Sequence, residues 1–266
     1  MTHLSIGFLG FGKMATAIFQ GSSSFLKEKG ISVYATDKYT ANIERNNINF
    51  LSIEELLNTV DIVLLAIKPQ QLNELADTLR SVSWEKKCLV SILAGKTLDN
   101  FHQLLENCPH LIRVMPNTAA QFNESMTVIS HSSNTDTHYL DFVTDLFSCV
   151  GKVMHVDDDR MNFCTSLCGS GPAFFYALAD SLVHLSTERG FSEKEARELV
   201  NQLCKGVAST LDSSSDSVST LIQSICSPNG TTERGLATLH GSQIPDLWKA
   251  VFIDAEKRAK ELSNSD

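Results

Sequence analysis

Two closely spaced glycines near the start of the chain stand where a short apolar strand runs into a helix. In a G-x-G-x-x-[GA] pattern, Gly10 permits a tight turn, Gly12 lets the backbone approach a pyrophosphate, and Ala15 lets the helix pack on the strand. The helix N-terminus then offers unpaired N–H groups and a positive dipole end to the anion. The order of strand, glycines and helix favours a dinucleotide site over a bare turn.

Small, proline or amide residues follow three later strands. Ligands of an open α/β sheet bind outside the carboxyl ends of its strands. We therefore expect Ala66, Lys68, Pro69, Ala94 and Asn117 to face the cofactor. Lys68 reads equally well as a solvated surface lysine and as a contact to cofactor phosphate or ribose.

Two segments of the second half concentrate turn formers before a helix, 169–173 (Gly-Ser-Gly-Pro-Ala) and 226–233 (Cys-Ser-Pro-Asn-Gly-Thr-Thr-Glu). The first predicts a flexible turn followed by a helix that starts near Pro172. A helix N-terminus with Ser and Thr hydroxyls suits a carboxylate. For either segment alone, an ordinary cap and turn is the preferred interpretation.

Apolar strand candidates alternate with helical stretches up to about residue 158. The candidates are Ser5–Leu9, Ile31–Ala35, Asp61–Ile67, Cys88–Leu93, Leu111–Met115, Met126–Ser130 and Lys152–Val156. This alternation predicts a Rossmann-type, doubly wound α/β domain over residues 1–158. Helical spacing continues from there, with capping-box patterns at Ser52/Glu55 and Ser192/Glu195 and a last helix near 246–262. The prediction is an all-helical domain over 159–266.

Composition narrows the classes of partner. The 266 residues are 42% hydrophobic and 20% charged, with a net charge of -9, which argues against nucleic acid or an anionic membrane as partner. We find no apolar run long enough for a membrane span and no signal-peptide pattern. Seven cysteines without C-x-x-C spacing predict reduced thiols in the cytoplasm and no metal site. The apolar stripes of the small helical domain pack either on each other or also on a second subunit.

Taken together, the motifs resemble the pyrroline-5-carboxylate reductase family over nearly the whole chain. They are the Gly10/Gly12 turn with Met14, 66–69 (Ala-Ile-Lys-Pro), 94–95 (Ala-Gly), 115–118 (Met-Pro-Asn-Thr), 169–173 and 227–232. The resemblance implies NAD(P)H-dependent reduction of 1-pyrroline-5-carboxylate, a cyclic imine, to L-proline. It also implies a homodimer through interleaved C-terminal helices, in some cases a larger ring of dimers.

The expected site has a cofactor part and a substrate part. Cofactor-binding residues are Phe8, Gly10, Phe11, Gly12, Lys13, Met14, Thr36, Lys38, Ala66, Lys68, Pro69, Ala94 and Asn117. Ser227, Gly230 and Thr231 would hold the substrate carboxylate, and Thr232 would hydrogen-bond the ring nitrogen as its catalytic partner. Water can protonate an imine, so the reaction needs no strong side-chain acid.

Several residues depart from the family pattern. Lys13 stands where Asn is usual, Ala119 where Pro is usual, and Asn229 where Gly is usual, although Asn tolerates positive φ. The stretch Ser213–Gln223 lacks the usual His-Pro and Lys-Asp pairs. We expect the substrate site to survive, with turnover and substrate affinity most open to change.

Two other functions fit parts of the chain. A β-hydroxyacid dehydrogenase has a similar opening turn but uses a Lys on the first long helix of its second domain, where this chain has Phe174, Phe175, Tyr176 and Leu178. A non-catalytic, nucleotide-binding regulatory homologue is the other alternative, and the intact Thr232 argues against it.

The choice between NADPH and NADH depends on the end of the second strand, where NAD enzymes usually carry an acid that binds the ribose. If that strand ends at Tyr34, the position holds Ala35, and Thr36 and Lys38 suit a 2′-phosphate. Asp37 would oppose that phosphate. We therefore predict that NADP(H) is preferred and NAD(H) possible.

Overall fold

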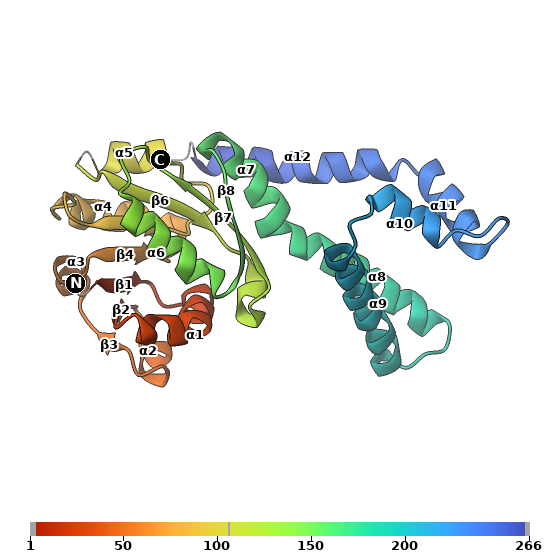
Figure 1. Ribbon diagram of the computed structural model, residues 1–266, viewed down its shortest axis with the longest axis horizontal. Helices are drawn as coiled ribbons and strands as arrows, with labels where there is room; N and C mark the ends of the chain where they lie inside the picture. The colour runs from red at the N-terminus through yellow and green to blue at the C-terminus, as the bar shows by residue number, and fades with distance from the viewer. Residues whose placement is uncertain (1–3, 106, 264–266) are drawn as a thin grey trace. The chain divides into compact units, whose positions relative to one another are not determined.

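The computed structural model describes residues 4–105 and 107–263, which form two compact units (Figure 1). The first unit holds the described residues up to Ser170 and those from Asp254 onward, and the second is Gly171–Ile253. The end residues of the predicted domains 1–158 and 159–266 lie outside the described residues. The two compact units are defined by contacts within the structure, and they do not test the predicted domain boundary at residue 158. That boundary stays a prediction.

An eight-stranded sheet runs through the first unit in the order β3-β2-β1-β4-β5-β6-β7-β8. The strands are β1 (Ser5–Leu9), β2 (Ser32–Thr36), β3 (Asn49–Phe50), β4 (Ile62–Leu65), β5 (Cys88–Ser91), β6 (His110–Met115), β7 (Ser125–His131) and β8 (Gly151–His155). The seven predicted strands are confirmed to within two residues at each end. The two-residue β3 was not predicted, because it is too short to show alternation.

Helices cover both faces of this sheet, which confirms the doubly wound fold. One apolar core contains side chains of α1 (Lys13–Glu28), α2 (Ala41–Arg45) and α6 (Thr137–Ser148). The core on the opposite face contains side chains of α3 (Ile53–Thr59), α4 (Leu72–Arg80) and α5 (Leu98–Leu104). Short 3₁₀ turns complete the unit at η1 (Pro69–Gln71), η2 (Thr118–Phe122) and η3 (Asp158–Arg160).

One pair of neighbouring strands breaks the parallel order. β6 and β7 are antiparallel, whereas the other strand pairs of the described sheet are parallel. The short segment 116–124, which contains η2 and the left-handed residue Asn123 (φ 59°), joins β6 to β7. Such a short connection cannot carry the chain back across the sheet, as a parallel pair requires.

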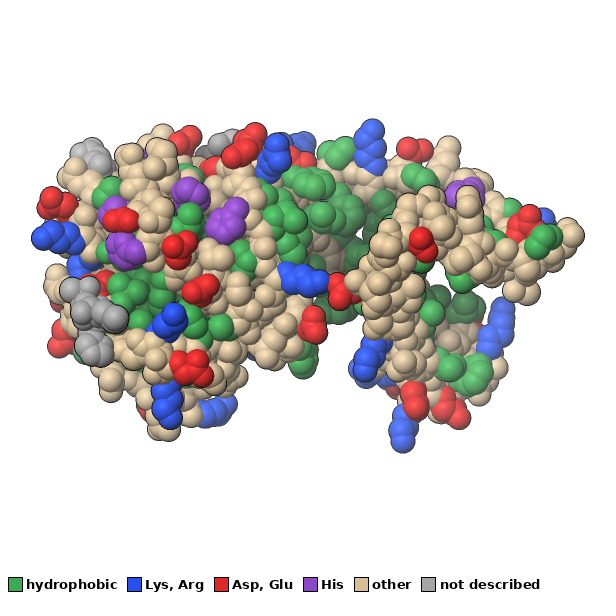
Figure 2. Space-filling model, in the orientation of Figure 1, with side chains coloured by type: hydrophobic (Ala, Val, Ile, Leu, Met, Phe, Trp, Pro, Cys, Tyr) green, Lys and Arg blue, Asp and Glu red, His purple; other side chains and the backbone are tan. Residues whose placement is uncertain are grey.

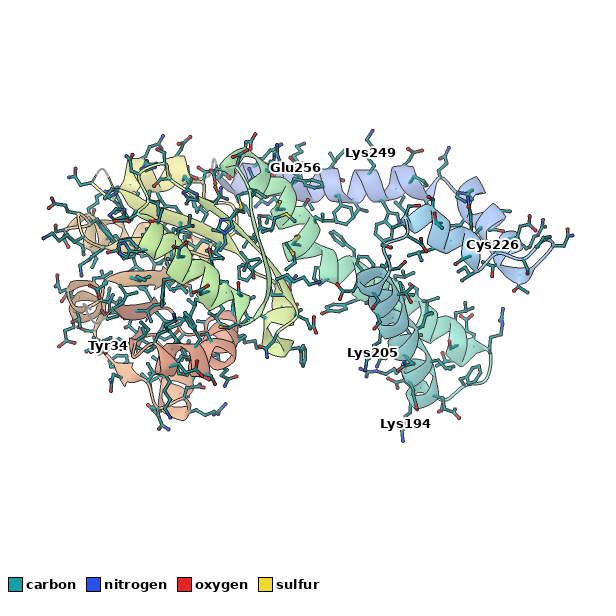
Figure 3. All side chains as sticks on the ribbon, in the orientation of Figure 1. Tyr34, Lys194, Lys205, Cys226, Lys249 and Glu256 are labelled. Carbon is teal, nitrogen blue, oxygen red and sulfur yellow. The ribbon has the colours of Figure 1, made fainter. Side chains whose placement is uncertain are left out.

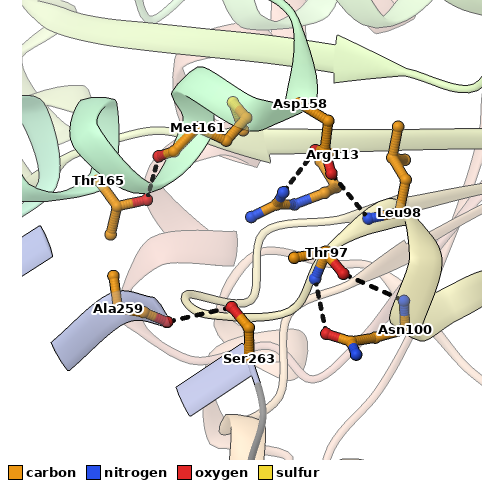
Figure 4. A network of polar contacts seen from close by, with 9 residues as sticks. All are labelled: Thr97, Leu98, Asn100, Arg113, Asp158, Met161, Thr165, Ala259 and Ser263. Atoms are coloured by element: carbon orange, nitrogen blue, oxygen red, sulfur yellow. Dashed lines mark hydrogen bonds and ion pairs between the residues drawn. The ribbon is translucent and has the colours of Figure 1, made fainter. Parts of the chain in front are cut away.

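A buried ion pair attaches the start of the helical half to the sheet (Figure 4). Arg113 of β6 is 2% exposed, and its guanidinium pairs with the carboxylate of Asp158 in η3. The other carboxylate oxygen of Asp158 accepts the N–H of Leu98, 3.2 Å away, at the start of α5. Burial lowers the pKa of Arg113, and the charge of Asp158 opposes that shift. The pair therefore fixes η3 against both β6 and α5.

The helices after η3 confirm the all-helical prediction. They are α7 (Met161–Cys164), the π-helical η4 (Thr165–Ser170), α8 (Gly171–Glu188), α9 (Glu193–Ser213), α10 (Val218–Ser224), α11 (Thr231–Gly241) and α12 (Ile244–Ser263). Both predicted capping boxes, Ser52 with Glu55 and Ser192 with Glu195, are present. The predicted flexible turn at Gly169–Ala173 is wrong, because the π-helical turn η4 leads directly into α8.

The second unit has almost no core of its own. Among its described residues only Gly171, Ala196 and Val200 are buried. Figure 2 shows hydrophobic (green) side chains at the surface of this unit. Its large exposed apolar side chains are Phe175, Tyr176, Leu178, Leu185, Leu199, Leu203, Val207, Leu211, Val218, Ile222, Ile225, Leu239, Leu247 and Ile253. An apolar groove of about 940 Å³ between α9 and α10 is lined by several of them. Exposed apolar surface of this extent marks an association surface.

We predict that the protein forms a dimer or larger oligomer through these helices at micromolar concentration. Leu203 in the groove is 56% exposed, and Leu203→Glu should weaken self-association at least about tenfold because it would place a charge in the apolar contact. Lys205→Glu, two residues along α9 (Figure 3), is the matched control and should leave the oligomer intact. Light scattering that finds a stable, folded wild-type monomer would contradict this prediction.

Candidate active site

The glycine turn joins the ends of three neighbouring strands. Gly10 has φ 91°, and a Cβ there would stand 2.8 Å from the carbonyl carbon and oxygen of Ala66, so only glycine fits. Its N–H donates to the carbonyl of Thr36 at 2.9 Å, and the N–H of Ala66 donates to the carbonyl of Leu9 at 2.8 Å. The ends of β1, β2 and β4 therefore meet at one point. In an open α/β sheet this is the switch point where nucleotides bind.

Gly12 differs from Gly10 in what surrounds it. It is the N-cap of α1 with φ -75°, no side chain caps the helix, and a Cβ built there would have no atom within 4 Å. The first turn of α1 contains no acidic residue. Open space beside uncapped helix N–H groups fits a pyrophosphate. Ala15 is buried against the sheet, which confirms its packing role.

Phe11 is held in the turn through its backbone, and this arrangement was missed by sequence reasoning. Its N–H donates to Oδ2 of Asp37 at 2.6 Å, and its carbonyl accepts Nδ2 of Asn42 at 3.3 Å. The ring is buried and meets the buried ring of Phe8 edge to face, with centroids 5.4 Å apart. The signal that could have revealed the contact is an acid placed directly after a strand.

The end of β2 lies later than the sequence analysis assumed. The strand ends at Thr36, not Tyr34, so Asp37 directly follows it. Thr36 is buried and Lys38 is exposed. The reason for the difference is that β2 pairs with β1 in full register as far as Leu9 with Thr36. The acid is therefore present at the strand end, with backbone N–H groups as its partners.

The other predicted cofactor residues lie along the same strand ends or in α1. Lys13 is exposed and Met14 half-buried in the first turn of α1. Lys68 is exposed, and its N–H donates to Oε1 of Gln71 at 3.1 Å, while Pro69 begins η1. Ala94 packs in a small apolar cluster with Met115 beyond β5.

Asn117 has a structural role at the end of β6. Its Oδ1 accepts the N–H of Ala119 at 3.0 Å, and its Nδ2 donates to the carbonyl of Cys168 in η4 at 3.1 Å. The hydrogen bond from Ala119 to Asn117 requires an N–H at position 119, and proline has none. Asn117 thereby connects the strand end to the π-helical turn.

Cys164, Cys168 and His155 are uncharged side chains at neutral pH. Burial raises the pKa of Cys164 and of Cys168, so both thiols stay protonated. Burial and the nearby His131 lower the pKa of His155, whose Nε2 lies 3.2 Å from Oγ1 of Thr144.

The predicted substrate residues lie in one tight turn, Ser227–Gly230, and in the first two positions of α11. The N–H of Gly230 donates to the carbonyl of Ser227 at 2.9 Å, with Pro228 and the left-handed Asn229 (φ 58°) between them. These features match a type II turn and confirm that Asn229 takes the backbone of the usual glycine. The N–H of Asn229 donates to Oε2 of Glu233 at 2.6 Å, which fixes the turn to α11.

This turn presents an uncapped helix N-terminus with two hydroxyls. Gly230 is the N-cap of the 11-residue α11 without a side-chain cap, and Thr231 and Thr232 are its first two residues. Such N–H groups together with hydroxyls can hold a carboxylate. The turn belongs to the second unit, whereas the glycine turn belongs to the first.

In the part of the chain that the structure describes, no helix is long and apolar enough to cross a membrane. The same residues contain no group of three or more His, Cys, Asp or Glu side chains that could hold a metal ion.

Comparisons with known proteins agree along the whole chain. Residues 158–262 match the family model for pyrroline-5-carboxylate reductase dimerisation, and residues 5–95 match that for NADP oxidoreductase, coenzyme F420-dependent. A pyrroline-5-carboxylate reductase of Staphylococcus aureus is 32% identical over 98% of both chains, and that of Staphylococcus haemolyticus 31% identical over 99% of both.

Solved structures show the same similarity. The Streptococcus pyogenes 1-pyrroline-5-carboxylate reductase has a TM-score of 0.87 at 28% identity, covering 98% of this chain and 100% of that one. The Plasmodium falciparum pyrroline carboxylate reductase, solved with NADP bound, shares the fold with a TM-score of 0.85 at 24% identity, covering 99% of both chains.

We predict that alanine at Gly12 affects cofactor binding, whereas alanine at Gly10 affects stability. Gly12→Ala should leave the melting temperature nearly unchanged and weaken NADPH binding at least about tenfold, because its methyl enters the space left for phosphate. Gly10→Ala should cost about 1–3 kcal/mol of folding free energy, because alanine is strained at its φ. Fluorescence titration beside thermal melts separates the two effects. If folded Gly12→Ala bound NADPH as tightly as the wild type, the pyrophosphate would not bind at this turn.

Proposed function

The chain belongs to the pyrroline-5-carboxylate reductase family, and we propose that it reduces 1-pyrroline-5-carboxylate to L-proline at the expense of NADPH. The observation that carries the proposal is the pairing of two preformed turns in one chain. One is the glycine turn at the switch point of the sheet, and the other is the Ser227–Gly230 turn before α11. The first suits a pyrophosphate and the second a carboxylate.

The residues of the first unit fit a dinucleotide. The open space at Gly12 and the uncapped start of α1 would hold its pyrophosphate. Ala66, Lys68, Pro69, Ala94 and Asn117 are proposed to border the rest of the molecule. When bound, reduced NADP supplies the hydride for the carbon of the imine.

The residues of the turn before α11 would orient the substrate. We assign the carboxylate to the hydroxyl of Ser227 and to the N–H groups at Gly230 and Thr231. Thr232 is assigned to the ring nitrogen, which accepts one proton while its carbon accepts hydride, so that C=N becomes CH–NH. Water can deliver the proton because an imine is basic, and Thr232 then needs only to stabilise the amine that forms.

Assembly and location complete the proposal. A homodimer through the C-terminal helices would cover the exposed apolar side chains of the second unit, and such dimers would build a larger ring. The seven cysteines, all free in the structure, support a reducing compartment such as the cytoplasm.

Thr232→Ala should lower kcat for 1-pyrroline-5-carboxylate about 5- to 150-fold, equivalent to about 1–3 kcal/mol, and leave NADPH binding almost unchanged. Its hydroxyl is proposed to bond the nitrogen more strongly as hydride arrives. Thr232→Ser should retain much of the activity. Thr238→Ala, on an exposed turn of the same helix, is the control. An unchanged kcat in a destabilised Thr232→Ala protein would reduce Thr232 to a helix-stabilising residue.

NADPH should bind more tightly than NADH, with Lys38 and the strand end at Thr36 near the 2′-phosphate. The physical reason is an exposed cation beside a strand-end carboxylate whose two oxygens already accept backbone N–H groups. Fluorescence titration with the two reduced cofactors gives the two dissociation constants. A clear preference for NADH would mean that Asp37 binds the ribose hydroxyls.

A further inference from the structure

The segment after β2 is tied to the glycine turn by a single carboxylate. Oδ2 of Asp37 accepts the N–H of Phe11 at 2.6 Å, and Oδ1 accepts the N–H of Tyr39 at 2.8 Å. One side chain therefore sets the spacing between the turn that suits a pyrophosphate and the backbone two residues past Asp37. An acid that binds a ribose would instead direct an oxygen at a ligand hydroxyl.

A second contact fixes the same segment from α2. Nδ2 of Asn42 donates to the carbonyl of Phe11 at 3.3 Å, so both backbone polar groups of Phe11 are bonded to residues 37–42. Phe11 itself is 1% exposed. The buried residue of the turn thus anchors an otherwise exposed stretch of chain.

That stretch presents an aromatic ring and a cation. The Tyr39 side chain is 74% exposed, although its N–H is fixed by Asp37. Nζ of Lys38 lies 6.0 Å from the centroid of the Tyr39 ring, within the range of a cation–π contact. A ring offers a stacking face to a nucleobase, and a neighbouring ammonium offers a charge to phosphate.

We propose that Asp37 is a positioning residue that holds Lys38 and Tyr39 as the binding site for the adenosine 2′-phosphate end of the cofactor. Tyr39 stacks on the adenine, Lys38 pairs with the 2′-phosphate, and Asp37 acts through the backbone of Phe11 and Tyr39. This assignment rests on the proposed use of NADPH. It adds Tyr39 as a residue that determines affinity and gives the strand-end acid a role other than ribose binding.

The test uses nucleotide fragments, so that binding is measured without imine reduction. Adenosine 2′,5′-bisphosphate carries the 2′-phosphate, and adenosine 5′-monophosphate is the same molecule without it. Both are titrated by calorimetry into the full-length protein and its variants. The exposed Phe122 (72%) is the matched aromatic control, as Phe122→Ser.

Each variant has its own expected pattern. Tyr39→Ser should weaken both fragments about 5- to 100-fold, and Tyr39→Phe should restore binding because the ring remains. Lys38→Met should weaken only the bisphosphate, about three- to tenfold. Asp37→Asn should raise KM for NADPH and for NADH by similar factors, with the loss in KM rather than in kcat.

Two results would overturn the inference. Fragment binding that is indifferent to Tyr39→Ser, in a variant that melts like the wild type, would remove the stacking role. Selective loss of NADH binding in Asp37→Asn, with NADPH unaffected or tighter, would make Asp37 a ribose ligand. Failure of the proposed function gives a different result. A protein that binds the bisphosphate through Tyr39 but does not reduce 1-pyrroline-5-carboxylate would contradict the proposed substrate and leave the proposed cofactor site intact.

Discussion

The left-handed backbone of Gly10 is the constraint on which the cofactor half depends. A Cβ on Gly10 would stand 2.8 Å from the Ala66 backbone, so only glycine allows the ends of β1, β2 and β4 to meet here. Since these strands stand next to one another in the sheet, their carboxyl ends form one edge. The start of α1 is then directed at that edge, with Gly12 open to a ligand. Phe11, between the two glycines, connects this turn to the segment after β2, because its N–H donates to the carboxylate of Asp37.

A different constraint governs the second unit. With only Gly171, Ala196 and Val200 buried among its described residues, it has too little core to stand alone. Its helices owe their order to local signals, such as the Ser192 capping box, and to the surface they cover on association. The turn that holds the proposed substrate residues lies in this unit. Activity should therefore depend on assembly as well as on the chemistry of the turn.

Local signals made much of this predictable from sequence. The Gly10/Gly12 turn, the capping boxes and the left-handed Asn229 can each be recognised from residues close together in the sequence, and the structure confirms them. Features that depend on distant pairing were not accessible. The end of β2, and with it the contact of Asp37, follows from register with β1. The π-helical turn before Gly171 contains small and polar residues that are typical of a flexible loop. Roles of the site residues in binding stay predictions.

The proposed reaction transfers hydride from NADPH to the imine carbon of 1-pyrroline-5-carboxylate. The most direct measurement incubates the wild-type oligomer with 1-pyrroline-5-carboxylate and NADPH that carries deuterium at the transferable position, and examines the product by mass spectrometry and NMR. We expect L-proline with one deuterium on the ring carbon that bore the double bond. Cofactor oxidation without deuterium in proline, or no proline from a folded and assembled protein, would contradict it.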